Sequence, residues 1–103
     1  MPKVSVKSSS SLSPDEAFSK VKNMLEQDRE LKKLDPEINY EFNDGGLSGE
    51  AKGKFFKANM QVTASGDASE VEIVIDLPFH LALAKGLVQK TLQDKLNKNL
   101  GNV

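Results

Sequence analysis

The chain has 103 residues, of which 38% are hydrophobic and 28% are charged, and its formal net charge is −1. This length predicts a single domain, residues 1–103, around one two-layer core, and the near-neutral charge offers no large field to attract nucleic acid or membrane headgroups. The absence of cysteine excludes disulfides, thiolate chemistry and most structural zinc sites.

The amino terminus, MPKVSVKSSSSLSPDE, lacks the apolar run of a signal peptide, and no stretch approaches the length of a membrane span. We therefore expect a cytoplasmic location and no transmembrane segment. Val4 and Val6 alternate with polar residues and predict a short first strand. Ser13 and Pro14 then begin a helix, because serine caps the first turn and proline suits the first helical position.

The first helix carries an apolar stripe at helical spacing. The stripe consists of Ala17, Phe18, Val21, Met24 and Leu25, and it resumes at Leu31 and Leu34. Asp28 interrupts it, so we expect a kink or a fresh turn at Asp28-Arg29. Asp35-Pro36 ends the helical region, because the residue before a proline disfavours the α conformation.

The next forty residues predict a meander of four strands. We place two-residue turns at Asp44-Gly45, Gly53-Lys54 and Gly66-Asp67, because glycine adopts the positive φ that such turns need. The resulting cross-strand pairs include Phe42 with Leu47, Tyr40 with Gly49, Ala51 with Phe56, Met60 with Ile73, and Val62 with Val71. All three turns keep the apolar side chains on one face, which a one-residue slip would reverse. A bulge at Gly53 within one long strand is the alternative.

The last strand and the last helix meet in the stretch from Ser69 to Lys85. The inward side of the strand consists of Val71, Ile73, Ile75 and Leu77. Pro78 ends the strand, because proline has no N–H for the ladder, and a helix is expected over about residues 79–100. This helix folds back over the apolar side of the strand. Its apolar arc consists of Leu81, Ala84, Leu87, Val88, Thr91, Leu92 and Leu96.

The predicted fold class is α+β, a two-layer β-α-β-β-β-β-α arrangement. We expect a curved antiparallel sheet in the order 1-5-4-3-2, with both helices on one face, similar to a reduced helix-grip fold. Larger relatives of that fold enclose apolar ligands. Small inward residues leave room for a slot, namely Gly49, Ala51, Ala58, Ala64 and Ala84. The opposing interpretation, which the short chain favours, is a core filled by Phe18, Phe42, Phe56 and Met60.

Motifs for chemistry are absent from the sequence. His80 is the only histidine, and by alternation it does not meet Asp76, which belongs to the outer sheet face. The nearest acidic cluster comprises Glu70, Glu72 and Asp76, and its spacing is that of any solvated strand. We therefore predict no catalytic, cofactor-binding or metal-binding residue. Lys52, Lys54 and Lys57 flank Phe55 and Phe56, which we interpret as a solvated strand edge rather than a nucleic-acid site.

A family resemblance is carried by Val71-x-Ile73-x-Ile75-x-Leu77-Pro78-Phe79, by Leu81 to Gly86 and by Val88-x-x-x-Leu92-x-x-x-Leu96. The opening fits as well, with a short strand followed by a Ser-Leu-Ser-Pro helix start. These segments resemble the polyhydroxyalkanoic acid system family, small bacterial proteins named for genes near granule-polymer genes. The resemblance implies no assigned reaction and places no catalytic residue on this chain.

We therefore expect a non-enzymatic accessory or binding protein, associated with polyhydroxyalkanoate granules, with another apolar surface such as lipid, or with a protein partner. The candidate contact residues are Phe55, Phe79 and Leu83. The alternative is a carrier that holds a small apolar ligand in a slot between the sheet and the last helix. Catalysis centred on His80 is a third hypothesis. A homodimer through an edge strand or the outer sheet face is compatible with all three.

Overall fold

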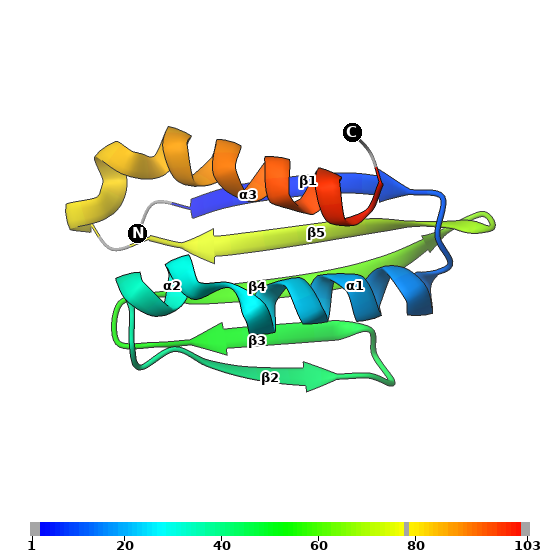
Figure 1. Ribbon diagram of the computed structural model, residues 1–103, viewed down its shortest axis with the longest axis horizontal. Coiled ribbons are helices and arrows are strands. Elements are labelled where there is room, and N and C mark those ends of the chain that lie inside the picture. The colour runs from blue at the N-terminus through cyan, green and yellow to red at the C-terminus, as the bar shows by residue number, and fades with distance from the viewer. Residues whose placement is uncertain (1–2, 78, 102–103) are drawn as a thin grey trace.

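The computed structural model describes residues 3–77 and 79–101, without the side chains of residues 30, 31, 34 and 79–81. The elements are β1 (Lys3–Ser10), α1 (Pro14–Gln27), α2 (Arg29–Leu34), β2 (Asn39–Asn43), β3 (Ser48–Lys52), β4 (Lys57–Ser65), β5 (Ala68–Asp76), the 3₁₀ helix η1 (Phe79–Ala84) and α3 (Lys85–Asn99). The strands form one antiparallel sheet in the order β1-β5-β4-β3-β2. Both long helices cover the same face of this sheet (Figure 1). The predicted α+β fold and strand order are confirmed.

The core lies between the sheet and this helical layer. Strand alternation buries one side of each strand, so β1 contributes Val4 and Val6 beneath α3, while the stripe of α1 packs over β4 and β5. Ser13 caps α1 as predicted, since its hydroxyl accepts a hydrogen bond from the amide of Glu16 at 3.3 Å. Asp28 ends α1 in an extended conformation, which confirms the expected break before α2.

The third turn has the predicted geometry, because Gly66 has a φ of +62° and Ser65 pairs directly with Ala68. Val62 accordingly lies opposite Val71, and Met60 lies opposite Ile73, as predicted. The Gly66-Asp67 turn therefore sets the register of the two longest strands.

The first two turns are longer than predicted, and both predicted registers are wrong. Four residues, 44–47, join β2 to β3, so Phe42 faces Gly49 and not Leu47. Four residues, 53–56, join β3 to β4, so Ala51 faces Ala58 and not Phe56. In the first loop the Asn43 side chain accepts a hydrogen bond from the amide of Gly46 at 3.1 Å, which supports the wider turn. Each register moves by two residues, so the apolar face is preserved.

The last helical region is divided, where one helix was predicted. Residues 79–84 form the 3₁₀ helix η1, and α3 begins only at Lys85. A 3₁₀ helix has three residues per turn, so η1 turns the start of α3 relative to a continuous α-helix. Within α3 the buried side is set by Leu92 and Leu96, and Leu87, predicted on the buried arc, is 70% exposed because it lies on nearly the opposite side of the helix from Leu96.

Candidate functional site

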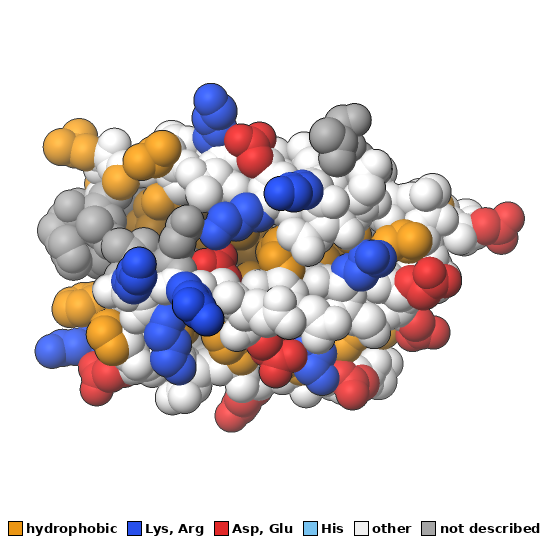
Figure 2. Space-filling view, in the orientation of Figure 1, with side chains coloured by type: hydrophobic (Ala, Val, Ile, Leu, Met, Phe, Trp, Pro, Cys, Tyr) orange, Lys and Arg blue, Asp and Glu red, His pale blue; other side chains and the backbone are white. Residues whose placement is uncertain are grey.

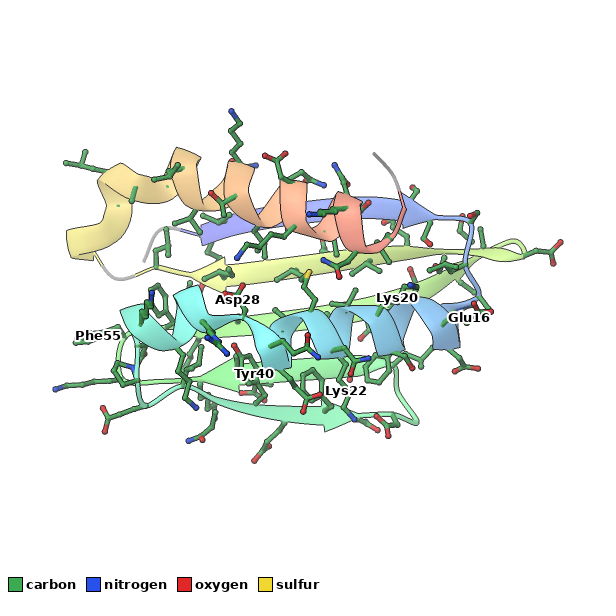
Figure 3. The ribbon with its side chains drawn as sticks, in the orientation of Figure 1. Glu16, Lys20, Lys22, Asp28, Tyr40 and Phe55 are labelled. Carbon is green, nitrogen blue, oxygen red and sulfur yellow. The ribbon has the colours of Figure 1, made fainter. Side chains whose placement is uncertain are left out.

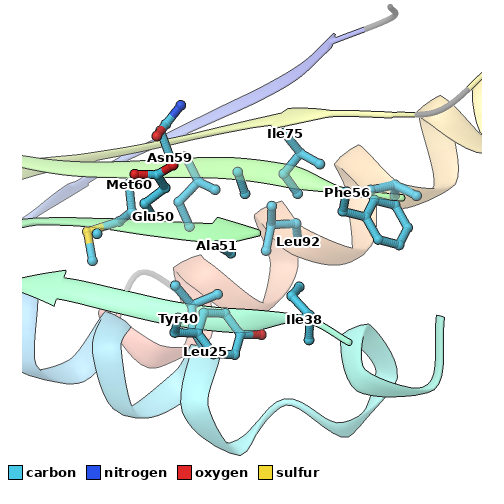
Figure 4. A pocket seen from close by; sticks show the side chains of 14 residues that line it. Leu25, Ile38, Tyr40, Glu50, Ala51, Phe56, Asn59, Met60, Ile75 and Leu92 are labelled. Carbon is cyan, nitrogen blue, oxygen red and sulfur yellow. The ribbon is translucent and has the colours of Figure 1, made fainter. Parts of the chain in front are cut away.

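A row of small side chains crosses the sheet one residue from the end of β3 and leaves a pocket above it. The direct cross-strand pairs run from Tyr40 to Ala51, from Ala51 to Ala58, and from Ala58 to Ile75. Two alanines between larger neighbours form a depression, and Gly49 lies beside them. Leu25 of α1 closes the pocket on one side, and Val88 and Leu92 of α3 close it on the other (Figure 4).

The pocket has a cavity volume of about 40 Å³, enough for a few water molecules. Of the five small residues predicted to leave a slot, Gly49, Ala51 and Ala58 line it, whereas Ala64 is exposed and Ala84 lies in η1. Phe18 and Phe42 meet edge to face at a ring distance of 6.2 Å and fill the other part of the inner face. The core is therefore filled at one end and hollow at the other.

Tyr40 gives this pocket its one unusual polar group. The Tyr40 ring stacks on Phe42 at 6.0 Å, and its hydroxyl is buried without a hydrogen-bond partner in the part of the chain that the structure describes. Asp28 lies nearby, where its carboxylate pairs with Lys95 at 3.2 Å. Burial raises the pKa of Tyr40 above its ordinary value of 10.0, and the negative charge of Asp28 raises it further.

Alkaline titration should reveal this environment. Tyr40 is the only tyrosine and tryptophan is absent, so ultraviolet absorbance reports Tyr40 alone. We expect its ionisation midpoint above 10 in the folded protein and near 10 in denaturant. Since the folded pKa is raised, the stability contributed by neutral Tyr40 is present below pH 10 and is lost as the pH rises through the folded pKa. Tyr40→Phe should remove this alkaline loss, and an identical loss in that variant would contradict the assignment.

A second feature is the end of the molecule where apolar side chains face water. One cross-strand row at this end of the sheet consists of Lys52, Lys57, Asp76 and Lys3. The β3–β4 loop follows Lys52 and η1 follows Asp76, so both lie beyond the same end of the sheet. We call this the loop end. Its exposed large apolar side chains are Phe55 at 41%, Leu83 at 104% and Leu87 at 70%. The predicted role of the Phe79 side chain lies outside the described side chains.

Basic side chains surround the loop end. Arg29, Lys32 and Lys33 of α2 are exposed, and the Lys54 ammonium lies 5.6 Å from the centre of the Phe55 ring. Figure 2 shows basic and hydrophobic side chains gathered at this end, whereas acidic side chains gather at the opposite end. Asp67 of the third turn and Asp15 of α1 belong to the elements of that opposite end. Basic side chains therefore outnumber acidic ones at the loop end, where Glu37 is an exposed acidic residue beside Lys54.

Asp35 holds the loop that presents Phe55, and sequence reasoning missed this role. The Asp35 carboxylate is fully buried and accepts hydrogen bonds from the amides of Phe55 at 2.8 Å, Phe56 at 3.3 Å and Glu37 at 3.2 Å. Burial raises the pKa of Asp35, but these amides and that of Lys54 outweigh it, so the pKa lies below the ordinary value. Figure 3 shows Phe55 projecting outward from this loop.

Comparison with solved structures identifies the fold. The chain resembles TTHA0849 from Thermus thermophilus, with a TM-score of 0.63, 16% identity and coverage of 96% of this chain and 94% of that one. It also resembles XoxI from Bacillus cereus, with a TM-score of 0.67, 14% identity and coverage of 98% and 94%. For Ara h 8.0201 the TM-score is 0.57, with 12% identity and coverage of 97% and 95%. The fold is a helix-grip fold. No family model and no curated protein sequence matches the chain.

The helix-grip fold positions both the pocket and the loop end. The pocket lies between the sheet and the two long helices, and the loop end lies where the chain passes from the sheet into the last helical region. Among the described residues, no group of three or more histidine, cysteine, aspartate or glutamate side chains could hold a metal ion. No described helix is both long and apolar enough to cross a bilayer. The hypothesis about His80 lies outside the described side chains.

Proposed function

We propose that the protein is a non-enzymatic binding protein that attaches to an apolar surface through the loop end. The observation that carries this proposal is the exposure of Leu83, Leu87 and Phe55 on one end of a small fold. Burying a leucine or phenylalanine side chain contributes about 1.5–3 kcal/mol, so three such side chains favour association with an apolar phase. Exposed apolar side chains gathered at one end of a small protein commonly mark interaction sites.

The surface that we propose is the polyhydroxyalkanoate granule. The sequence segments that resemble the polyhydroxyalkanoic acid system family support this choice, and membership of that family, a bacterial origin and a cytoplasmic location are parts of the same proposal. The exposed cations of α2 favour a granule coat that carries negative charge, with a contribution of about 1 kcal/mol for each cation near the surface.

Co-sedimentation with purified granules tests this proposal. We expect the unmodified protein to pellet with the granules, and the double variant Leu83→Ser/Leu87→Ser to bind at least about tenfold more weakly. Both side chains are exposed, so the variant should keep its thermal midpoint. The matched control is Ala64→Ser, an exposed residue of β4 near the opposite end.

Two outcomes would contradict the proposal. If the double variant and the control pellet equally, the loop end does not make the contact. If the protein pellets with anionic lipid vesicles but not with granules, the loop end binds an apolar surface and the granule is the wrong one. Reduced binding at high salt would show the contribution of the α2 cations, because salt screens exposed charges.

A second candidate function is that of a carrier for a small apolar ligand. The observation in its favour is the pocket lined by Ala51, Ala58 and the neighbouring side chains of both helices. Its position between the sheet and the last helix is where larger helix-grip proteins enclose apolar ligands. Native mass spectrometry of protein purified from its host should show added mass, and a bare protein mass would count against the carrier.

A further inference from the structure

The buried Tyr40 hydroxyl is a polar group for which the described part of the fold supplies no partner. It belongs to β2, and Tyr40 lines the pocket together with Ile38 and Ala51. A buried O–H without an acceptor destabilises the folded protein, so its retention calls for a reason. Figure 4 shows the Tyr40 oxygen beside Ile38, at the edge of the group of lining side chains.

Water is a poor partner for this hydroxyl. A buried water molecule needs two to four polar partners, and the side chains around Tyr40 in the pocket are mostly those of leucine, isoleucine and alanine. Glu50 and Asn59 also border the pocket, but Figure 4 shows their polar ends on the side away from Tyr40. A ligand with an apolar body and one acceptor atom fits this arrangement better than water does.

The charge beside Tyr40 restricts the acceptor. The Asp28 carboxylate is only 5% exposed and acts on the Tyr40 hydroxyl, so a second anion at this position would be repelled. Lys95 already pairs with Asp28 at 3.2 Å. The acceptor is therefore expected to be neutral, as in an alcohol or a carbonyl compound.

We propose that the pocket binds a small neutral amphiphile whose apolar body lies over Ala51 and Ala58 and whose oxygen accepts a hydrogen bond from the Tyr40 hydroxyl. This inference rests on the carrier function and names its ligand class. The cavity of about 40 Å³ suits a ligand of a few heavy atoms, and a longer one must displace part of α3.

The test compares three probes of similar size, 1-butanol, n-pentane and butyrate, in nuclear magnetic resonance titrations that follow the amides of Ala51 and Ala58. In the unmodified protein we expect 1-butanol to bind more tightly than pentane and butyrate not to bind at pH 7. In Tyr40→Phe, which keeps the ring, the affinity for 1-butanol should fall at least tenfold and that for pentane should change less than twofold. Ala58→Leu should abolish the binding of both by filling the pocket.

The outcomes separate this inference from the carrier function on which it rests. Equal binding of 1-butanol by the unmodified protein and by Tyr40→Phe, or preferential binding of butyrate, would overturn the role of Tyr40 and leave an apolar carrier. Absence of binding by 1-butanol and pentane alike would overturn both. Tyrosine fluorescence, which reports Tyr40 alone in this chain, gives an independent readout for the unmodified protein.

Discussion

Replacing Asp35 with alanine is expected to lower the midpoint of thermal unfolding by about 10 °C or more. The substitution removes the Asp35 acceptor from the amides of Phe55, Phe56 and Glu37, of which the Phe56 bond is buried and the other two are partly buried. A lost hydrogen bond to a buried donor costs the desolvation of that donor, and here several donors lose one partner together. Circular dichroism melts measure the shift. Asp35→Asn should have a smaller effect, because an amide oxygen still accepts hydrogen bonds.

Gly53 provides a stringent control for this prediction. A Cβ at Gly53 would collide with the Asp35 carboxylate, so Gly53→Ala should destabilise the unmodified protein. In the Asp35→Ala background the obstacle is gone, and the same substitution should cost much less. Additive effects in this double-mutant cycle would show that Gly53 is needed for another reason. Gly86→Ala is the matched glycine control, since nothing lies within 4 Å of a Cβ there and alanine favours a helix by about 1 kcal/mol.

The same carboxylate makes stability depend on pH in the acidic range. The folded pKa of Asp35 lies below the ordinary value of 3.8, so its stabilising contribution is present above that value. The contribution is lost as the pH falls through the lowered pKa of the folded state, where protonation weakens the acceptor. Asp35→Asn should therefore show a shallower loss of stability below pH 4 than the unmodified protein.

The sequence predicted the burial pattern because that pattern depends on alternation, and it predicted the sheet order because strands joined by short turns pair as neighbours. A side chain stays on the same face when a register moves by two residues, so errors at the first two turns left the core list almost intact. The third turn was predicted correctly, since Gly66 there adopts the positive φ of a two-residue hairpin. Gly45 and Gly53 do not have a positive φ. A glycine in the sequence was therefore not sufficient evidence for a two-residue turn at these two positions.

The role of Asp35 could not be predicted from local patterns. Asp35-Pro36 was interpreted as the end of a helix, which it is, but the carboxylate also reaches a loop about twenty residues further along the chain. The φ of Gly53 does not require a glycine, and its lack of a Cβ is explained instead by the approach of the Asp35 carboxylate. Such a pairing depends on tertiary approach, and only a structure shows which aspartate and which loop meet.

The exposure of two candidate contact residues could be predicted more securely than the position of the pocket. Phe55 was expected to face outward and Leu83 to lie off the buried arc, and the structure exposes both. The pocket depends on Ala51 facing Ala58, a pair that the predicted register did not contain. The small residues in the sequence indicated a slot, but its position depends on the direct pairing of Ala51 with Ala58, which only the structure shows.

Leu96→Ala is expected to cost about 2–5 kcal/mol of unfolding free energy, while Leu87→Ala should change it by about 0.5 kcal/mol or less. Leu96 is completely buried on the inner side of α3, whereas Leu87, in the first turn of the same helix, is 70% exposed. Urea denaturation of the two variants and of Leu92→Ala, which is also buried, measures the difference.

The predicted arc, which included Leu87, would give the opposite ranking. If that side chain packed against the sheet beside Leu92, its truncation would open a cavity and cost as much as Leu92→Ala. At 3.6 residues per turn, however, Leu87 lies on nearly the opposite side of α3 from Leu96, so the burial of Leu96 turns Leu87 toward solvent. A small effect at Leu87 together with a large one at Leu96 would support this orientation of α3, so the same stability measurement checks whether Leu87 is available for binding at the loop end.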